Sequence, residues 1–67
     1  MAIQSVLFDK NKWSVMDATE WLEKKGLRHY KVDITNKFIR FRQHDPVSGS
    51  RYVTKKLPNG IEYVLNF

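Results

Sequence analysis

The chain has 67 residues, no cysteine, and 12 lysines and arginines against seven aspartates and glutamates, a formal net charge of +5. This length predicts one domain, residues 1–67, and leaves no room for a second domain or for a membrane span of about 20 apolar residues. Without cysteine, disulfides and thiolate zinc sites are excluded, and with 42% hydrophobic and 13% aromatic residues the chain is typical of a folded domain. Residues 1–12 lack the pattern of a signal peptide, so we expect an intracellular protein.

A strand and a helix are predicted first. Residues 2–8 (AIQSVLF) are short, apolar and rich in β-formers, and predict a strand. Ser14 is a typical helix N-cap, with Asp17 at the third helical position as in a capping box. The helix has one predicted buried stripe, formed by Val15, Ala18, Trp21 and Leu22. Gly26 then ends the helix in a left-handed conformation.

From residue 30 to residue 42 the pattern alternates and predicts a β-hairpin with a two-residue turn at Asn36 and Lys37. The hairpin has four cross-strand pairs: Ile34 with Ile39, Val32 with Phe41, Asp33 with Arg40, and Lys31 with Arg42. The first two pairs form an apolar face and the last two a polar face. A shift of one residue would expose the apolar set to water, so this register is favoured.

The rest of the chain predicts a loop and two more strands. Residues 44–50 (HDPVSGS) carry the Asp-Pro and Ser-Gly signals of a loop. Residues 51–57 and 61–67 predict strands on either side of a Pro-Asn-Gly turn. The expected fold is α+β, a small antiparallel or mixed β-sheet in the order β-α-β-β-β-β with one α-helix packed on a face.

The sequence offers no recognisable catalytic centre. His29 and His44 are its two histidines, its serines stand in no nucleophile motif, and its three glycines stand apart, so there is no glycine-rich phosphate loop. The pair His44-Asp45 resembles a fragment of a metal site, but two adjacent ligand types in a loop are typical of a solvated turn. We expect no enzyme, no cofactor and no metal.

The excess positive charge lies in residues 28–56, which hold eight lysines and arginines against two aspartates, whereas residues 1–27 are balanced. Basic side chains interleaved with aromatic ones are typical of single-strand binding. The candidate nucleic-acid-binding residues are Lys31, Arg40, Arg42, Arg51, Lys55, Lys56, Phe38 and Tyr52. The alternative is structural: Arg40 pairs with Asp33, and Phe38 completes a small second core. Trp13 and Trp21 are likewise either core residues or anchors for a protein partner.

Motifs over nearly the whole chain carry a resemblance, the most specific being Arg40-Phe41-Arg42-Gln43 and Gly60-Ile61. The others are Phe8-Asp9-Lys10, Lys12-Trp13, Ala18, Trp21-Leu22, Gly26, Val32-Asp33, Pro46 and Arg51-Tyr52. This pattern resembles a small domain of tailed phages and large DNA viruses. The resemblance implies a viral source, hence the host cytoplasm, the nucleus or a virion, and no particular activity.

A weaker similarity, to a single-strand-binding coactivator domain, rests on Ile39-Arg40, on residues 52–56 and on Gly60-Ile61. That family places its helix after the strands, whereas here the predicted helix precedes four of them.

The leading hypothesis is a non-catalytic module that binds single-stranded nucleic acid or its backbone. The alternative is a virion or regulatory module that binds another protein or a second copy of itself. We expect no membrane partner.

Overall fold

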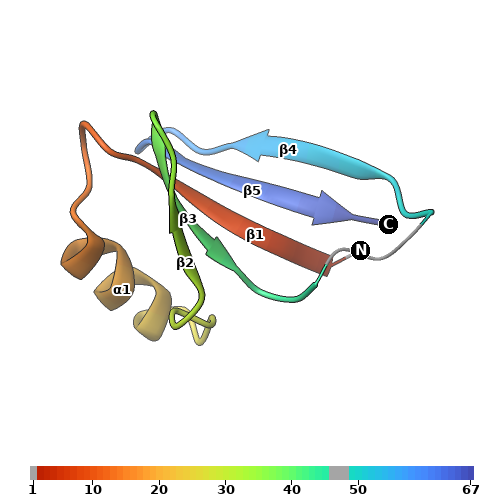
Figure 1. Ribbon diagram of the computed structural model, residues 1–67, viewed down its shortest axis with the longest axis horizontal. Helices are drawn as coiled ribbons and strands as arrows, with labels where there is room; N and C mark the ends of the chain where they lie inside the picture. The colour runs from red at the N-terminus through yellow and green to blue at the C-terminus, as the bar shows by residue number, and fades with distance from the viewer. Residues whose placement is uncertain (1, 46–48) are drawn as a thin grey trace.

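The computed structural model describes residues 2–45 and 49–67, and this part of the chain forms one helix packed on a five-stranded antiparallel sheet (Figure 1). The α+β prediction is therefore confirmed. The elements are β1 (Ala2–Asp9), α1 (Val15–Lys24), β2 (Val32–Ile34), β3 (Phe38–Arg42), β4 (Tyr52–Lys56) and β5 (Ile61–Asn66). Residues 46–48, which belong to the predicted loop and include the motif residue Pro46, lie outside the described residues.

The first strand is the central one, because the order across the sheet is β2-β3-β1-β5-β4. β1 pairs with β3 on one side and with β5 on the other. One face of the sheet, which we call the helix face, meets α1 with Val6 and Phe8 from β1. These side chains join a buried core completed by Ala18, Leu22, Ile39, Phe41 and Ile61.

The helix begins and ends as the sequence predicts. The Ser14 side chain accepts a hydrogen bond from the backbone N–H of Asp17 at 3.1 Å, and Gly26 has a φ of 72°. The buried stripe is narrower than predicted, since the Val15 residue is 40% exposed. Contact with the core is limited to Ala18, Trp21 and Leu22, which lie in the middle turns of this ten-residue helix.

The predicted hairpin register is confirmed: Ile34 faces Ile39, Asp33 faces Arg40 and Val32 faces Phe41. The four apolar side chains share one face of the sheet as predicted, but they are not equally buried. Ile39 and Phe41 are buried, whereas Val32 and Ile34 are 41% and 61% exposed. The reason is that β2 lies at the edge of the sheet, so its side chains have a neighbouring strand on one side only.

The opposite face of the sheet, which we call the open face, has no helix over it in the described part of the chain. The pairing shifts between Ile3 and Ser5, so Gln4 is an extra residue in β1, a β-bulge. Both Gln4 and Ser5 are buried. Within residues 2–45 and 49–67, no helix is long and apolar enough to span a membrane.

Candidate nucleic-acid interface

Three of the predicted site residues share the open face of β3. Ile39 and Phe41 are buried on the helix face, so the alternating residues Phe38, Arg40 and Arg42 lie on the open face. Successive side chains on one face of a strand are about 7 Å apart. The structure therefore brings one aromatic and two guanidinium groups into a line along β3.

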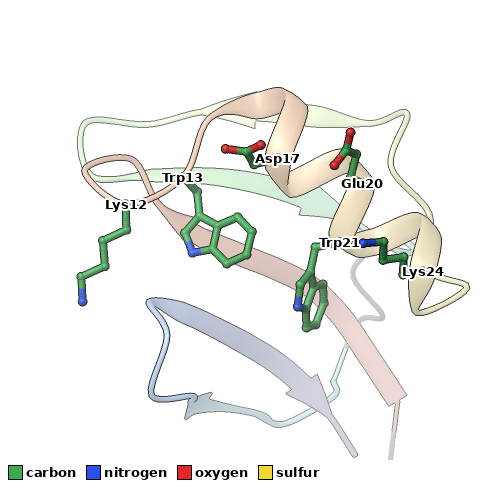
Figure 2. A pocket seen from close by; sticks show the side chains of 6 residues that line it. All are labelled: Lys12, Trp13, Asp17, Glu20, Trp21 and Lys24. Carbon is green, nitrogen blue, oxygen red and sulfur yellow. The ribbon is translucent and has the colours of Figure 1, made fainter.

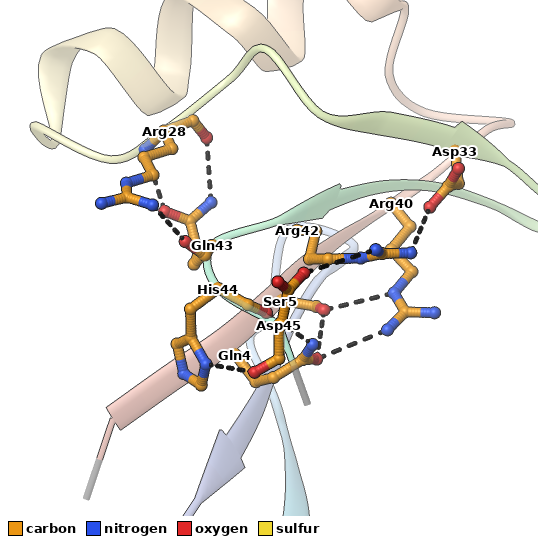
Figure 3. A network of polar contacts seen from close by, with 9 residues as sticks. All are labelled: Gln4, Ser5, Arg28, Asp33, Arg40, Arg42, Gln43, His44 and Asp45. Carbon is orange, nitrogen blue, oxygen red and sulfur yellow. Dashed lines mark hydrogen bonds and ion pairs between the residues drawn. The ribbon is translucent and has the colours of Figure 1, made fainter. Parts of the chain in front are cut away.

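Arg40 is held by neutral oxygen atoms (Figure 3). Its Nε donates to the hydroxyl of Ser5 at 3.2 Å, and its Nη2 donates to Oε1 of Gln4 at 3.4 Å. The Ser5 hydroxyl itself donates to the same Gln4 oxygen. Within the described residues, no carboxylate forms an ion pair with Arg40. The guanidinium is thus fixed in position with its charge uncompensated.

The predicted side-chain pair between Asp33 and Arg40 is wrong. Their backbones do face each other, but the Asp33 carboxylate lies 3.4 Å from Nη2 of Arg42. The β-bulge explains the exchange, because it places Gln4 and Ser5 together beside Arg40. Asp45 lies 3.8 Å from Nη1 of Arg42 as well. Two carboxylates therefore balance the charge of Arg42, and its side chain is 34% exposed.

Gln43, which the sequence marked only as part of a motif, has a structural role. Its side chain accepts from the backbone N–H of Arg28 at 2.9 Å and donates to the carbonyl of the same residue at 2.9 Å. Arg28 in turn donates from Nη1 to the Gln43 carbonyl at 3.0 Å. These three hydrogen bonds fasten the segment after α1 to the end of β3 (Figure 3).

The remaining predicted residues are divided between the two faces. Lys56 and Tyr52 lie on the open face of β4, since Lys56 pairs with Glu62 and Tyr52 with Asn66. Three strand spacings, about 14 Å, separate them from β3. Lys55 pairs with Tyr63 and lies on the helix face. The two outlying residues are Arg51, directly before β4, and Lys31, directly before β2.

The His44-Asp45 pair, which resembles a fragment of a metal site, makes a contact with the backbone. The Nδ1 atom of His44 lies 2.8 Å from the carbonyl oxygen of Asp45, a backbone contact rather than a ligand arrangement. In the described ranges, no three histidine, aspartate or glutamate side chains gather closely enough to hold a metal ion.

Trp13 and Trp21 are half-buried and line a groove beside α1 (Figure 2). Both indole rings pack edge-on against Phe8, with centroids at 5.1 and 5.7 Å. Each ring therefore contacts the core, as the first alternative drawn from the sequence predicts, and each also lines the groove. An anchor for a protein partner stays a prediction.

A comparison of the chain with protein-family models, curated proteins and solved structures found no match.

Proposed function

We propose that this protein is a non-catalytic module that binds single-stranded nucleic acid or its phosphate backbone through the open face of the sheet. A viral or phage source is part of the proposal, and its support is the resemblance carried by Arg40-Phe41-Arg42-Gln43 and Gly60-Ile61.

The observation that carries the proposal is that the Arg40 guanidinium is held in place by neutral oxygens. A guanidinium has five N–H donors, and Arg40 donates to the neutral oxygens of Ser5 and Gln4. Its remaining donors and its full charge are available to an anion. Phosphate oxygens match the planar fork of arginine, and a group that is already held in place loses little entropy on binding.

Phe38 supports a nucleic-acid ligand over a simple anion. It lies two residues from Arg40 on the same face of β3 and is partly exposed. An aromatic ring beside a cationic group is the usual arrangement for stacking an unpaired base next to its phosphate. Arg42 extends the line, although Asp33 and Asp45 already balance its charge.

The test is the salt dependence of binding. A fluorescently labelled single-stranded oligonucleotide is titrated with the protein at several salt concentrations, and anisotropy gives the Kd. Arg40→Gln should weaken binding and reduce the slope of log affinity against log salt by about 0.7, the value for one lost phosphate contact. Arg42→Gln should change the slope less, because carboxylates already compensate that charge.

Lys37→Gln is the matched control, since Lys37 is an exposed cation in the hairpin turn outside the line of Phe38, Arg40 and Arg42. It should leave the slope near that of the parent protein. A parent protein that does not bind, or an Arg40→Gln variant with the parent slope, would contradict the proposal.

A protein-binding function is the second candidate, and the edge strand β4 favours it. All five residues of β4 are exposed, and within the described ranges the strand pairs with β5 alone. Such an edge can accept another strand. If the protein binds a protein partner in this way, binding should not require oligonucleotide, and Arg40→Gln should not weaken it.

A further inference from the structure

We propose that the groove lined by Trp13 and Trp21, on the opposite side of the sheet from Arg40, binds an unpaired nucleobase and its flanking phosphates. The inference rests on the proposed function for its ligand class, but it names a separate site on the helix face.

The groove has a volume of about 320 Å³ and is lined by Lys12, Trp13, Asp17, Glu20, Trp21 and Lys24. This volume lies at the lower end of the range for small-molecule sites, about 300–1,000 Å³. It therefore suits one small planar group rather than a folded partner.

The two indole rings are fixed before any ligand arrives. Trp13 donates from Nε1 to the carbonyl of Asn59 at 2.9 Å, and this bond ties it to the turn between β4 and β5. Trp21 is held between Phe8 and Tyr63, with ring centroids at 5.7 and 6.3 Å. Because both rings also remain partly exposed, they offer rigid stacking surfaces to a base.

The charged side chains around the two indoles are arranged in an order that matches a base between two phosphates. Figure 2 shows Lys12 and Lys24 toward opposite ends, the two indoles between them, and Asp17 and Glu20 along the helix. Within the described part of the chain, none of these four charged side chains forms an ion pair. The ammonium of Lys25 lies over the ring of Trp21, 5.5 Å from its centroid, a cation–π contact that a base stacking on that face would replace.

This mixture favours a nucleotide over simpler ligands. Two lysines repel a small cation and two carboxylates repel a small anion, so neither kind of ion gains from the whole groove. A base between phosphates uses every group: the indoles stack on the ring, the lysines contact phosphates, and the carboxylates accept hydrogen bonds from an exocyclic amino group. Cytosine carries such an amino group and thymine does not.

The chain's own tryptophan fluorescence tests the inference, because Trp13 and Trp21 are its two tryptophans. The folded protein is titrated with ten-nucleotide oligodeoxycytidine and oligodeoxythymidine. Both should quench the emission, and oligodeoxycytidine should bind several-fold more tightly. Asp17→Asn combined with Glu20→Gln should reduce this preference. Lys12→Gln and Lys24→Gln should each weaken quenching several-fold, whereas Lys37→Gln should not.

The outcomes separate the two proposed surfaces. Quenching that depends on Lys12 and Lys24 but not on Arg40 supports the groove and contradicts the open-face site. Binding by anisotropy that depends on Arg40 and leaves the emission unchanged overturns the groove and keeps the proposed function. Quenching insensitive to both lysines also overturns the groove. Absence of any binding overturns both proposals.

Discussion

Phe8 is the residue on which the contact between helix and sheet depends most. It is fully buried and packs edge-on against three rings, those of Trp13, Trp21 and Phe41, at centroid distances of 5.1, 5.7 and 5.6 Å. Edge-to-face pairs contribute beyond the burial of their area. One side chain of the central strand therefore connects the helix, the segment before it and the neighbouring strand β3.

Phe8→Ala should destabilise the domain by about 3–5 kcal/mol, the usual cost of removing a buried aromatic ring. That cost is close to the total stability of a domain this small, so the variant should be largely unfolded. Phe8→Leu keeps most of the volume but loses the three ring contacts, so it should cost less than Phe8→Ala but more than the ~1.5 kcal/mol of a volume-conserving swap. Urea denaturation measures both, and a loss below 1 kcal/mol for Phe8→Ala would mean that the three ring contacts are not formed.

Gly26 and Gly60 allow a comparison of backbone strain with steric crowding. Both have a positive φ, 72° and 84°. A Cβ at position 26 meets nothing within 4 Å, whereas one at position 60 would lie 3.0 Å from Cδ of Lys12 and 3.3 Å from Cβ of Asp9. Gly26→Ala should cost about 1 kcal/mol from strain alone, and Gly60→Ala should cost clearly more. Equal losses in urea denaturation would show that the neighbours of Gly60 move aside freely.

The hairpin of β2 and β3 joins an edge strand to a buried one. Ile34 and Ile39 face each other across it, so their side chains share one face of the sheet. Ile39 is 3% exposed and Ile34 is 61% exposed. The two positions differ in burial but not in the kind of residue or in the type of strand pairing.

Ile34→Thr should change stability by less than about 0.5 kcal/mol, since threonine is also a good strand former and the position is solvated. Ile39→Thr should cost about 2 kcal/mol or more, because it removes buried apolar volume and buries a hydroxyl. Thermal unfolding of the two variants checks the difference. Similar melting temperatures would place both side chains in the same environment and contradict the edge position of β2.

The local features of the fold could be predicted from the sequence, and the long-range ones could not. The N-cap at Ser14 and the hairpin register follow from residues a few positions apart. The exposure of Ile34 depends on which strand lies at the edge of the sheet, and the sequence of residues 30–42 does not indicate which strand that is. The partner of Arg40 depends on a bulge 36 residues earlier, although two adjacent polar residues, Gln4 and Ser5, in an otherwise apolar strand were a signal for it.

The same limit applies to the candidate interface. Alternation along β3 was enough to predict that Phe38, Arg40 and Arg42 share a face. It was not enough to divide the basic residues after position 50 between two faces, because that division depends on the register of β4 against β5. The groove beside Trp13 was also beyond prediction, since it needs Asn59 to lie next to a residue 46 positions away.

At the scale of the whole molecule, α1 covers only part of a wide sheet, as far as residues 2–45 and 49–67 show. Five strands span about 19 Å, whereas a helix with its side chains is about 10–12 Å across. Three residues that are paired across the helix face show how far α1 covers the sheet. Val6 on β1 is buried, Tyr63 on β5 is half-buried, and Lys55 on β4 is exposed. The Trp13–Trp21 groove lies at this transition.

Unfolding should nevertheless be a single transition. The core has one cluster, and Phe8 belongs both to the central strand and to the contacts with Trp13 and Trp21. Far-ultraviolet circular dichroism and tryptophan emission should therefore give the same melting temperature, as in small two-state domains. Tryptophan emission that changes at a lower temperature would show that α1 leaves the sheet before the sheet melts.

The central position of β1 also has a consequence for biosynthesis. Of the described strands, β1 is the first to be translated, and β5, one of its two neighbours, is the last to leave the ribosome. Until residues 61–66 have been made, Val6 and Phe8 lack the buried partner Ile61, and β4 has no strand to pair with. A frameshift or premature stop before residue 61 therefore removes the cooperative fold as a whole, rather than shortening the sheet by one edge strand.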